Sequence, residues 1–264
     1  MSAIKRENRV MKRGAFVMLD ALGYKGIWRR PEVKDAPGRV VERMARLRDD
    51  ATAEVARMLG RPLAELRADP ANAYDDFNIS FLSDTVAIGV WVKSTPYAAD
   101  ERMRDRFAVM FGAAFASAVM RCALTEPPRL AFRGALAVGD FEMSEDGIFI
   151  AGPAVDDAAS LHEQAQGAFV WIAPSAMAGA GYDIPTVEFT GHRLIRYAVP
   201  LKGGDSYNTY VVSPFAAGSA ESERSTQALW LRGSFLTEDR PPPLDVAIKL
   251  QNTSHFIDLA LKTP

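Results

Sequence analysis

Hydrophobic and polar residues follow two different periods along this chain, and the changes between them predict its elements. Residues 14–20 form an apolar run typical of a buried strand, and residues 77–93 alternate in the manner of a hairpin. Residues 38–59 place apolar side chains at helical spacing, with arginines on the opposite face. Similar patterns predict helices at 98–124 and 153–166. The chain therefore mixes strands with long helices.

The order of these elements indicates the fold class. Further strands are expected at 130–138, 148–150 and 168–173. Helices packed on a sheet with antiparallel strands define an α/β (α+β) layer fold, and the order is compatible with a ferredoxin-like βαββαβ core. Residues 216–226 have the composition of an exposed linker, and the run from 244 to 261 predicts a C-terminal helix. The simplest division is a domain at 14–213 followed by a linker and C-terminal helical extension at 214–264.

Composition narrows the classes of function. A net charge of −2 argues against a dedicated nucleic-acid binder, and the single cysteine, Cys122, excludes an intrachain disulfide or a cysteine-built zinc site. The uncharged stretch Phe107–Met120 is shorter than the roughly 20 residues that span a bilayer. It suits a close-packed helix inside the protein or at a subunit contact. The basic residues at 5–13 lack the apolar segment of a secretory signal, so we expect a soluble, cytoplasmic protein without a membrane partner.

Two aspartates stand where apolar strands end. Asp20 closes the first predicted strand, and Asp84 lies in the turn of the predicted hairpin. Two carboxylates from neighbouring strand ends can hold hard divalent cations, which bring nucleotide phosphates with them. The alternatives are a helix cap or Asx-turn for Asp20 and an ordinary turn residue for Asp84. We interpret the pair as a metal-dependent phosphoryl- or nucleotidyl-transfer site; the chain has no Gly-x-Ser-x-Gly elbow and no Walker-type phosphate loop.

Three blocks in order carry a resemblance to a known family. They are the Asp-x-x-Gly-aromatic turn of Asp20, Gly23 and Tyr24, the strand–turn–strand around Asp84, and residues 152–161. In this order they resemble the class III nucleotide cyclases over most of residues 14–213, which would be the catalytic domain. The resemblance implies attack of the ribose 3′-hydroxyl on the α-phosphate, loss of pyrophosphate, and two Mn²⁺ or Mg²⁺ ions per site.

The resemblance also assigns roles to the first two blocks. It implies that Asp20 and Asp84 carry both ions and that the backbone carbonyl of Ala21 completes one coordination shell. The turn formed by Ala21, Leu22, Gly23 and Tyr24 leads into a short helical segment, whose free N–H groups are expected to cradle the phosphates.

At the base-recognition positions the chain departs from the purine cyclases of that family. Ser80 and Phe149 stand where those enzymes have a lysine and an aspartate or threonine. A phenylalanine cannot accept a hydrogen bond from an adenine amino group, and a serine reaches less far than a lysine. The alternative is that both are strand residues without ligand contact. We read the substitutions as favouring a pyrimidine base.

The helix-start block and the late lysine turn depart as well. Asp156 and Ser160 replace the asparagine and the arginine of the family, so the cation that stabilises the transferring phosphate is missing there. Lys202 matches the family's late Lys-Gly turn and is expected to contact the phosphates or the base, although Gly204 replaces a second lysine. Arg133 lies in an apolar strand, where we expect it to pair with a carboxylate.

The segments FRGALAVGDF and IAGPAVDDAASLHEQ are similar to those of the pyrimidine cyclases of bacterial Pycsar antiphage systems. That resemblance implies conversion of UTP, or alternatively CTP, to a cyclic nucleotide that acts on a separate effector protein. Uridylate cyclase, forming cyclic UMP, is our leading hypothesis. The alternatives are a purine cyclase with altered motifs and a catalytically inactive, cyclase-like nucleotide-binding scaffold.

The family's architecture further implies a homodimer with interfacial active sites. The metal aspartates would come from one subunit, and the helix-start block and Lys202 from the other. The apolar contact surface is expected from the helix around 107–120 and from the C-terminal run near Phe256.

Overall fold

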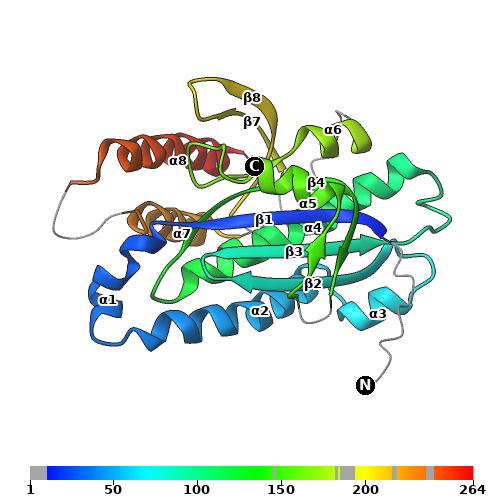
Figure 1. The fold of residues 1–264 in the computed structure, drawn as a ribbon, viewed down its shortest axis with the longest axis horizontal. Coiled ribbons are helices and arrows are strands. Elements are labelled where there is room, and N and C mark those ends of the chain that lie inside the picture. The colour runs from blue at the N-terminus through cyan, green and yellow to red at the C-terminus, as the bar shows by residue number, and fades with distance from the viewer. Residues whose placement is uncertain are drawn as a thin grey trace, which may run out of the picture.

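Four antiparallel strands form the centre of the structure, a computed structural model that describes residues 11–144, 147–181, 184, 194–215, 219–235 and 241–263. Within these residues the sheet has eight strands, ordered β2-β3-β1-β4-β6-β8-β7, with β5 paired to β4 (Figure 1). The strands are β1 (Lys12–Leu22), β2 (Tyr74–Leu82), β3 (Thr85–Val92), β4 (Ala131–Met143), β5 (Ile150–Ala151), β6 (Val170–Ile172), β7 (Leu194–Pro200) and β8 (Ser206–Val212).

The connections of the first four strands establish the core. The helical elements are η1 (Tyr24–Arg29), α1 (Pro31–Lys34), α2 (Gly38–Met58), α3 (Leu63–Ala68), α4 (Glu101–Thr125), α5 (Pro153–Leu161), α6 (Pro174–Ala180), α7 (Glu221–Gly233) and α8 (Leu244–Lys262). Helices connect β1 to β2 and β3 to β4, and the pairs β1–β3, β1–β4 and β2–β3 are all antiparallel. This is the expected βαββαβ order, so the mixed α/β fold class is confirmed. Beyond it, β6 pairs with β4 in parallel, and the hairpin β7–β8 extends the sheet.

The alternation of side chains along β1 divides the core between the two faces of the sheet. Ala15, Val17 and Leu19 point into the cluster that holds α2 and α4, whereas Phe16 and Met18 pack with α5. Successive strand residues face opposite sides, and here both sides are covered by helices. This explains why the first strand reads as an unbroken apolar run. The aromatic side chain of Phe256 in α8 packs on the outer strands with Phe169.

Helix α4 is buried nearly all round. It packs against β1, β3 and β4 as well as α2 and α6. By length and composition it could span a membrane, but 94% of its apolar window is buried inside the protein, as in the core helix of a soluble protein. The expected dimer surface is therefore corrected for α4, because Phe111 and Phe115 are at most 1% exposed and cannot supply an external apolar face. In α8, Phe256 is buried as well, but Ile248 and Leu259 are 41% and 38% exposed.

Element boundaries differ from the expectation in several places, and the strand expected to end at 138 continues to Met143. The helix predicted over 153–166 ends at Leu161, because Ala165 pairs with Leu201 in an isolated bridge. The predicted linker is shorter than expected, since residues 221–226 begin α7; its buried Gln227, Ala228 and Leu231 stabilise the helix. Residues 216–218 of that linker and the basic residues 5–10 lie outside the described residues.

Candidate active site

The ends of β1 and β2 bring Asp20 and Asp84 to one corner of the sheet. Asp20 pairs with Thr85 of β3, and Asp84 immediately precedes that strand in a two-residue turn whose Ser83 has φ 63°. The N–H of Ala21 donates a 2.9 Å hydrogen bond to the carbonyl of Asp84. The two aspartates are therefore held together by the backbone, although 64 positions separate them in the sequence.

Arg133 lies beside Asp20 on the other neighbouring strand. The β1–β4 register pairs Asp20 with Arg133, and Nε and Nη2 donate to the same carboxylate oxygen, Oδ2, at 3.0 and 2.9 Å. The two side chains are only 15% and 9% exposed, so solvent screens the pair weakly. The expectation that Arg133 pairs with a carboxylate is confirmed, and its partner is the proposed metal ligand itself.

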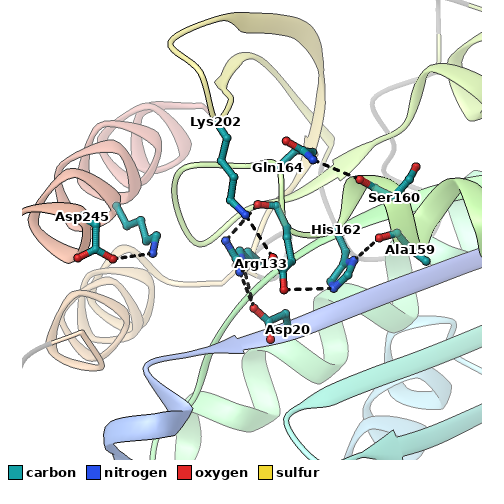
Figure 2. A network of polar contacts seen from close by, with 10 residues as sticks. Asp20, Arg133, Ala159, Ser160, His162, Gln164, Lys202 and Asp245 are labelled. Atoms are coloured by element: carbon teal, nitrogen blue, oxygen red, sulfur yellow. Dashed lines mark hydrogen bonds and ion pairs between the residues drawn. The ribbon is translucent and has the colours of Figure 1, made fainter.

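Glu163 connects Arg133 to Lys202. Its backbone carbonyl accepts from Arg133 Nη1 at 3.1 Å, and its Oε2 lies 3.8 Å from Arg133 Nη2. The same Oε2 is 3.2 Å from Lys202 Nζ, and the Lys202 N–H donates to the Gln164 carbonyl at 2.8 Å. Ion pairs thus connect Asp20 through Arg133 and Glu163 to Lys202 in the β7–β8 turn. Figure 2 shows Arg133 between Asp20 and Lys202. We call these four residues the charge network.

Glu163 was not singled out by the sequence, because a glutamate just after a helix has no distinctive pattern. The hydrogen bond from the Lys202 ammonium lowers the pKa of Glu163, and the nearby Arg133 charge adds to that effect. Glu163 therefore carries a negative charge between two cations. His162 Nε2 lies 4.0 Å from its other carboxylate oxygen.

The turn after Asp20 begins later than expected, because Ala21 and Leu22 still belong to β1 and pair with Phe132 and Ala131. Ala21 and Leu22 are buried, and Gly23 has φ 73°, a left-handed conformation that glycine adopts without strain. Tyr24 begins η1 and packs edge-on against Trp28. The side chains of Ala21 and Leu22 thus belong to the core, and these two residues can meet a ligand only through their backbone groups.

Ser80, in β2, contacts the turn that contains Phe149. The Ser80 hydroxyl is buried and donates to the carbonyl of Gly147 at 3.0 Å. Phe149 lies in the same turn, where its N–H donates to Ser144 Oγ at 2.9 Å and its side chain is 58% exposed. The structure therefore brings both base-position residues to the β4–β5 connection, with the Ser80 proton already engaged.

Asp156 lies apart from the charge network. It is exposed in the first turn of α5, and its N–H donates to Gly152. The next residue, Asp157, accepts a hydrogen bond from the Ser175 hydroxyl, and the Ser160 hydroxyl donates to the Asp157 carbonyl. Within the described residues, neither Asp156 nor Ser160 makes a hydrogen bond or ion pair with Arg133 or Lys202.

The donor set at this corner suits a hard divalent cation. Carboxylate and carbonyl oxygens are the ligands that Mg²⁺ and Mn²⁺ prefer. Within the part of the chain that the structure describes, no group of three or more His, Cys, Asp or Glu residues gathers anywhere. Asp20 and Asp84 would therefore need further oxygens from backbone carbonyls and from the substrate's phosphates.

Comparisons with known proteins give likenesses of structure only. No family model matches the chain, and no curated protein matches it. Similar solved structures include the catalytic core of a rhodopsin-guanylyl cyclase with converted specificity, in complex with ATPαS (13% identity, TM-score 0.46, 78% of this chain and 97% of that one). Another is the adenylyl cyclase CyaB from P. aeruginosa (14% identity, TM-score 0.44, 80% and 100%).

A third is a class III adenylyl cyclase-like ATP-binding protein from Pseudomonas aeruginosa, with 16% identity and a TM-score of 0.38 over 95% of this chain and 43% of that one. Values this low leave the function to be argued from the residues of this chain.

Proposed function

We propose that this protein is a nucleotide cyclase that converts UTP to 3′,5′-cyclic UMP and pyrophosphate. The observation that carries the proposal is the corner where Ala21 N–H joins the Asp20 and Asp84 segments, with the glycine turn beside it. Two carboxylates and a backbone-lined turn at one strand end suit a triphosphate accompanied by divalent cations. The resemblance of the ordered motifs to class III cyclases supports the same reading.

The residues divide the work between holding the cations and binding the phosphates. Asp20, Asp84 and the Ala21 carbonyl would hold two Mn²⁺ or Mg²⁺ ions. When bound, such ions make a hydroxyl more acidic and neutralise triphosphate charge. Lys202 and Arg133 are the nearby cations, and a cation placed where charge develops stabilises phosphoryl transfer. Arg133 is a candidate for the role of the family's missing arginine.

Base choice is proposed to depend on Ser80 and Phe149. The Ser80 hydroxyl donates to Gly147, so it has acceptor capacity left for a base N–H. The exposed ring of Phe149 can stack on a base of any identity. Neither offers the hydrogen-bonding reach of a lysine with an aspartate, which supports a pyrimidine, UTP before CTP. By resemblance, the product would act on a separate effector in antiphage defence within the cytoplasm.

A homodimer with interfacial sites remains part of the proposal, but the contacts of Lys202 within its own chain bear on it. Within one chain, Glu163 already links Lys202 to the Arg133 beside Asp20. Lys202 would have to leave Glu163 to reach the site of a partner subunit. Whether Lys202 acts within its own chain or across the dimer is therefore a separate, testable part of the proposal.

The direct experiment incubates purified protein with ATP, GTP, CTP or UTP plus Mn²⁺ and separates the products by chromatography. Cyclic UMP should dominate, because Ser80 and Phe149 lack the lysine and carboxylate groups that hydrogen-bond a purine. Asp84→Ala is the preferred inactive control, since it leaves the Arg133–Asp20 pair intact. Faster cyclisation of ATP or GTP than of either pyrimidine would establish the purine alternative instead.

A second candidate is a nucleotide-binding scaffold without catalysis. The observations that favour it are the exposed carboxylate of Asp156 at the helix start and the occupation of Asp20 by Arg133. A scaffold should bind a nucleoside triphosphate in equilibrium dialysis yet release no pyrophosphate with any of the four substrates.

A further inference from the structure

Arg133 occupies the carboxylate that a metal ion would need. Its Nε and Nη2 both donate to Oδ2 of Asp20, and the two side chains are nearly buried. A guanidinium and a divalent cation that approach the same carboxylate repel each other strongly where water is scarce. Cation binding at Asp20 therefore competes with the ion pair that this chain makes on its own.

The structure offers Arg133 a second acceptor within reach. Nη1 already bonds the Glu163 carbonyl at 3.1 Å, and Nη2 lies 3.8 Å from Glu163 Oε2. The guanidinium can therefore turn from one carboxylate to the other while it keeps its backbone hydrogen bond. This keeps a buried positive charge paired in both positions, which a charge removed from water requires.

The same movement affects Lys202. Its ammonium shares Oε2 of Glu163 with Arg133, at 3.2 Å against 3.8 Å. Closer approach of Arg133 places two cations on one oxygen and weakens the ion pair between Lys202 and Glu163. Lys202 is exposed and lies in a glycine-rich turn. Lys202 is then available for another anion.

We propose that Arg133 is an internal counter-ion of the cation site, which moves from Asp20 to Glu163 when a divalent cation binds and thereby loosens Lys202. Arg133 and Glu163 act here as positioning residues. This inference rests on the proposed cation site at Asp20 and Asp84, and it adds a coupling between cation occupancy and the availability of a phosphate-binding lysine.

The test measures Mn²⁺ binding without nucleotide, from the loss of the free-ion electron paramagnetic resonance signal. Arg133→Gln should bind Mn²⁺ about tenfold more tightly than wild type, an effect of about 1.4 kcal/mol. Glu163→Gln should bind it several-fold more weakly, because Arg133 loses its second carboxylate and the glutamine amide oxygen is only a neutral acceptor. Arg13→Gln is the matched control: it breaks another partly buried Arg–Asp pair on β1, Arg13–Asp105, and should leave binding unchanged.

Two further measurements separate movement from a simple change of charge. In the Arg133→Gln background, Glu163→Gln should lose most of its effect, whereas a purely electrostatic effect would persist. In wild type, Mg²⁺ should shift the Arg133 side-chain N–H signal in a ¹⁵N correlation spectrum and leave that of Arg13 in place. Circular dichroism confirms that each variant is folded.

The outcomes distinguish this inference from the proposed function. If wild type binds Mn²⁺ and Asp84→Ala abolishes binding, but Arg133→Gln binds no more tightly, the inference fails and the cation site stands. If Arg133→Gln is tighter but the Glu163→Gln effect is equal in both backgrounds, the transfer to Glu163 is refuted. If no variant binds Mn²⁺, the cation site and this inference both fall.

Discussion

Replacing Asp20 by alanine should destabilise the protein as well as inactivate it, unlike the replacement of Asp84. Asp20 is the carboxylate that holds the nearly buried guanidinium of Arg133, through two hydrogen bonds near 3 Å. Within the described ranges of the chain, the Asp84 side chain makes no ion pair or hydrogen bond. Only the first change removes the closest partner of a nearly buried charge.

The expected size follows from the surroundings of Arg133. Removing one partner of a buried ion pair costs about 3–5 kcal/mol of unfolding free energy. Arg133 keeps the Glu163 carbonyl at 3.1 Å and a carboxylate oxygen at 3.8 Å, which places Asp20→Ala at the lower end, ~3 kcal/mol. For a chain of this length that is a loss of roughly 6–12 °C in Tm. Asp84→Ala should stay within about 0.5 kcal/mol of wild type.

Urea denaturation followed by circular dichroism measures these free energies. The decisive variant is Asp20→Ala combined with Arg133→Met, which removes both charges and should recover much of the loss, with a coupling of about 2–3 kcal/mol. Asp20→Asn, which retains an acceptor, should fall between wild type and Asp20→Ala. Equal stability of Asp20→Ala and Asp84→Ala, or additive losses in the double variant, would show that the ion pair contributes nothing.

Three more predictions concern reactivity, packing and assembly. Burial raises the pKa of Cys122 from 9.0 to about 11, so at pH 8 the thiolate fraction is ~10⁻³ rather than ~10⁻¹. Iodoacetamide should therefore label the folded protein about 100-fold more slowly than the urea-unfolded chain, and labelling should become faster as pH rises. Equal labelling rates would refute the burial argument. Gly134→Ala should lower Tm severely, because its Cβ would lie 2.2 Å from a β1 carbonyl oxygen. Gly139→Ala should lower Tm only slightly, because the nearest atom to its Cβ would be at 3.5 Å. Equal Tm values for the two variants would contradict this. Mixed Asp20→Ala and Lys202→Ala chains should regain up to about a quarter of wild-type cyclase activity if sites are shared across a twofold dimer, and no recovery in verified heterodimers would assign Lys202 to its own chain.

Periodicity predicted the central elements of the fold, because the apolar pattern within each element indicates which of its side chains are buried. The apolar run of β1 and the helical spacing of α2 depend on neighbours within one element. The first residues of α7 were missed for the opposite reason: they are polar, and burial of Ala228 and Leu231 farther along the helix stabilises it. Tertiary packing, rather than local composition, therefore determines where α7 begins.

The site was predictable only in part, for the same physical reason. Asp20 and Asp84 stand out because each interrupts an apolar strand pattern. That Arg133 needs a carboxylate also follows from its apolar surroundings, but its partner depends on the β1–β4 register across 113 positions. Glu163 lies in an irregular segment, and only the three-dimensional path brings it between two cations.

The nearly complete burial of α4 has a consequence for synthesis on the ribosome. Its partners β4, α6 and α7 all follow it in the chain, so its apolar surface stays partly uncovered while roughly 110 more residues are added, about 5–20 s of translation. During that interval the nascent helix has the length and hydropathy of a membrane-spanning segment. Early contact with α2 and the β1–β3 strands, which emerge first, protects one side of it. Slow elongation beyond residue 125 should therefore favour chaperone capture or aggregation of this chain over its native folding.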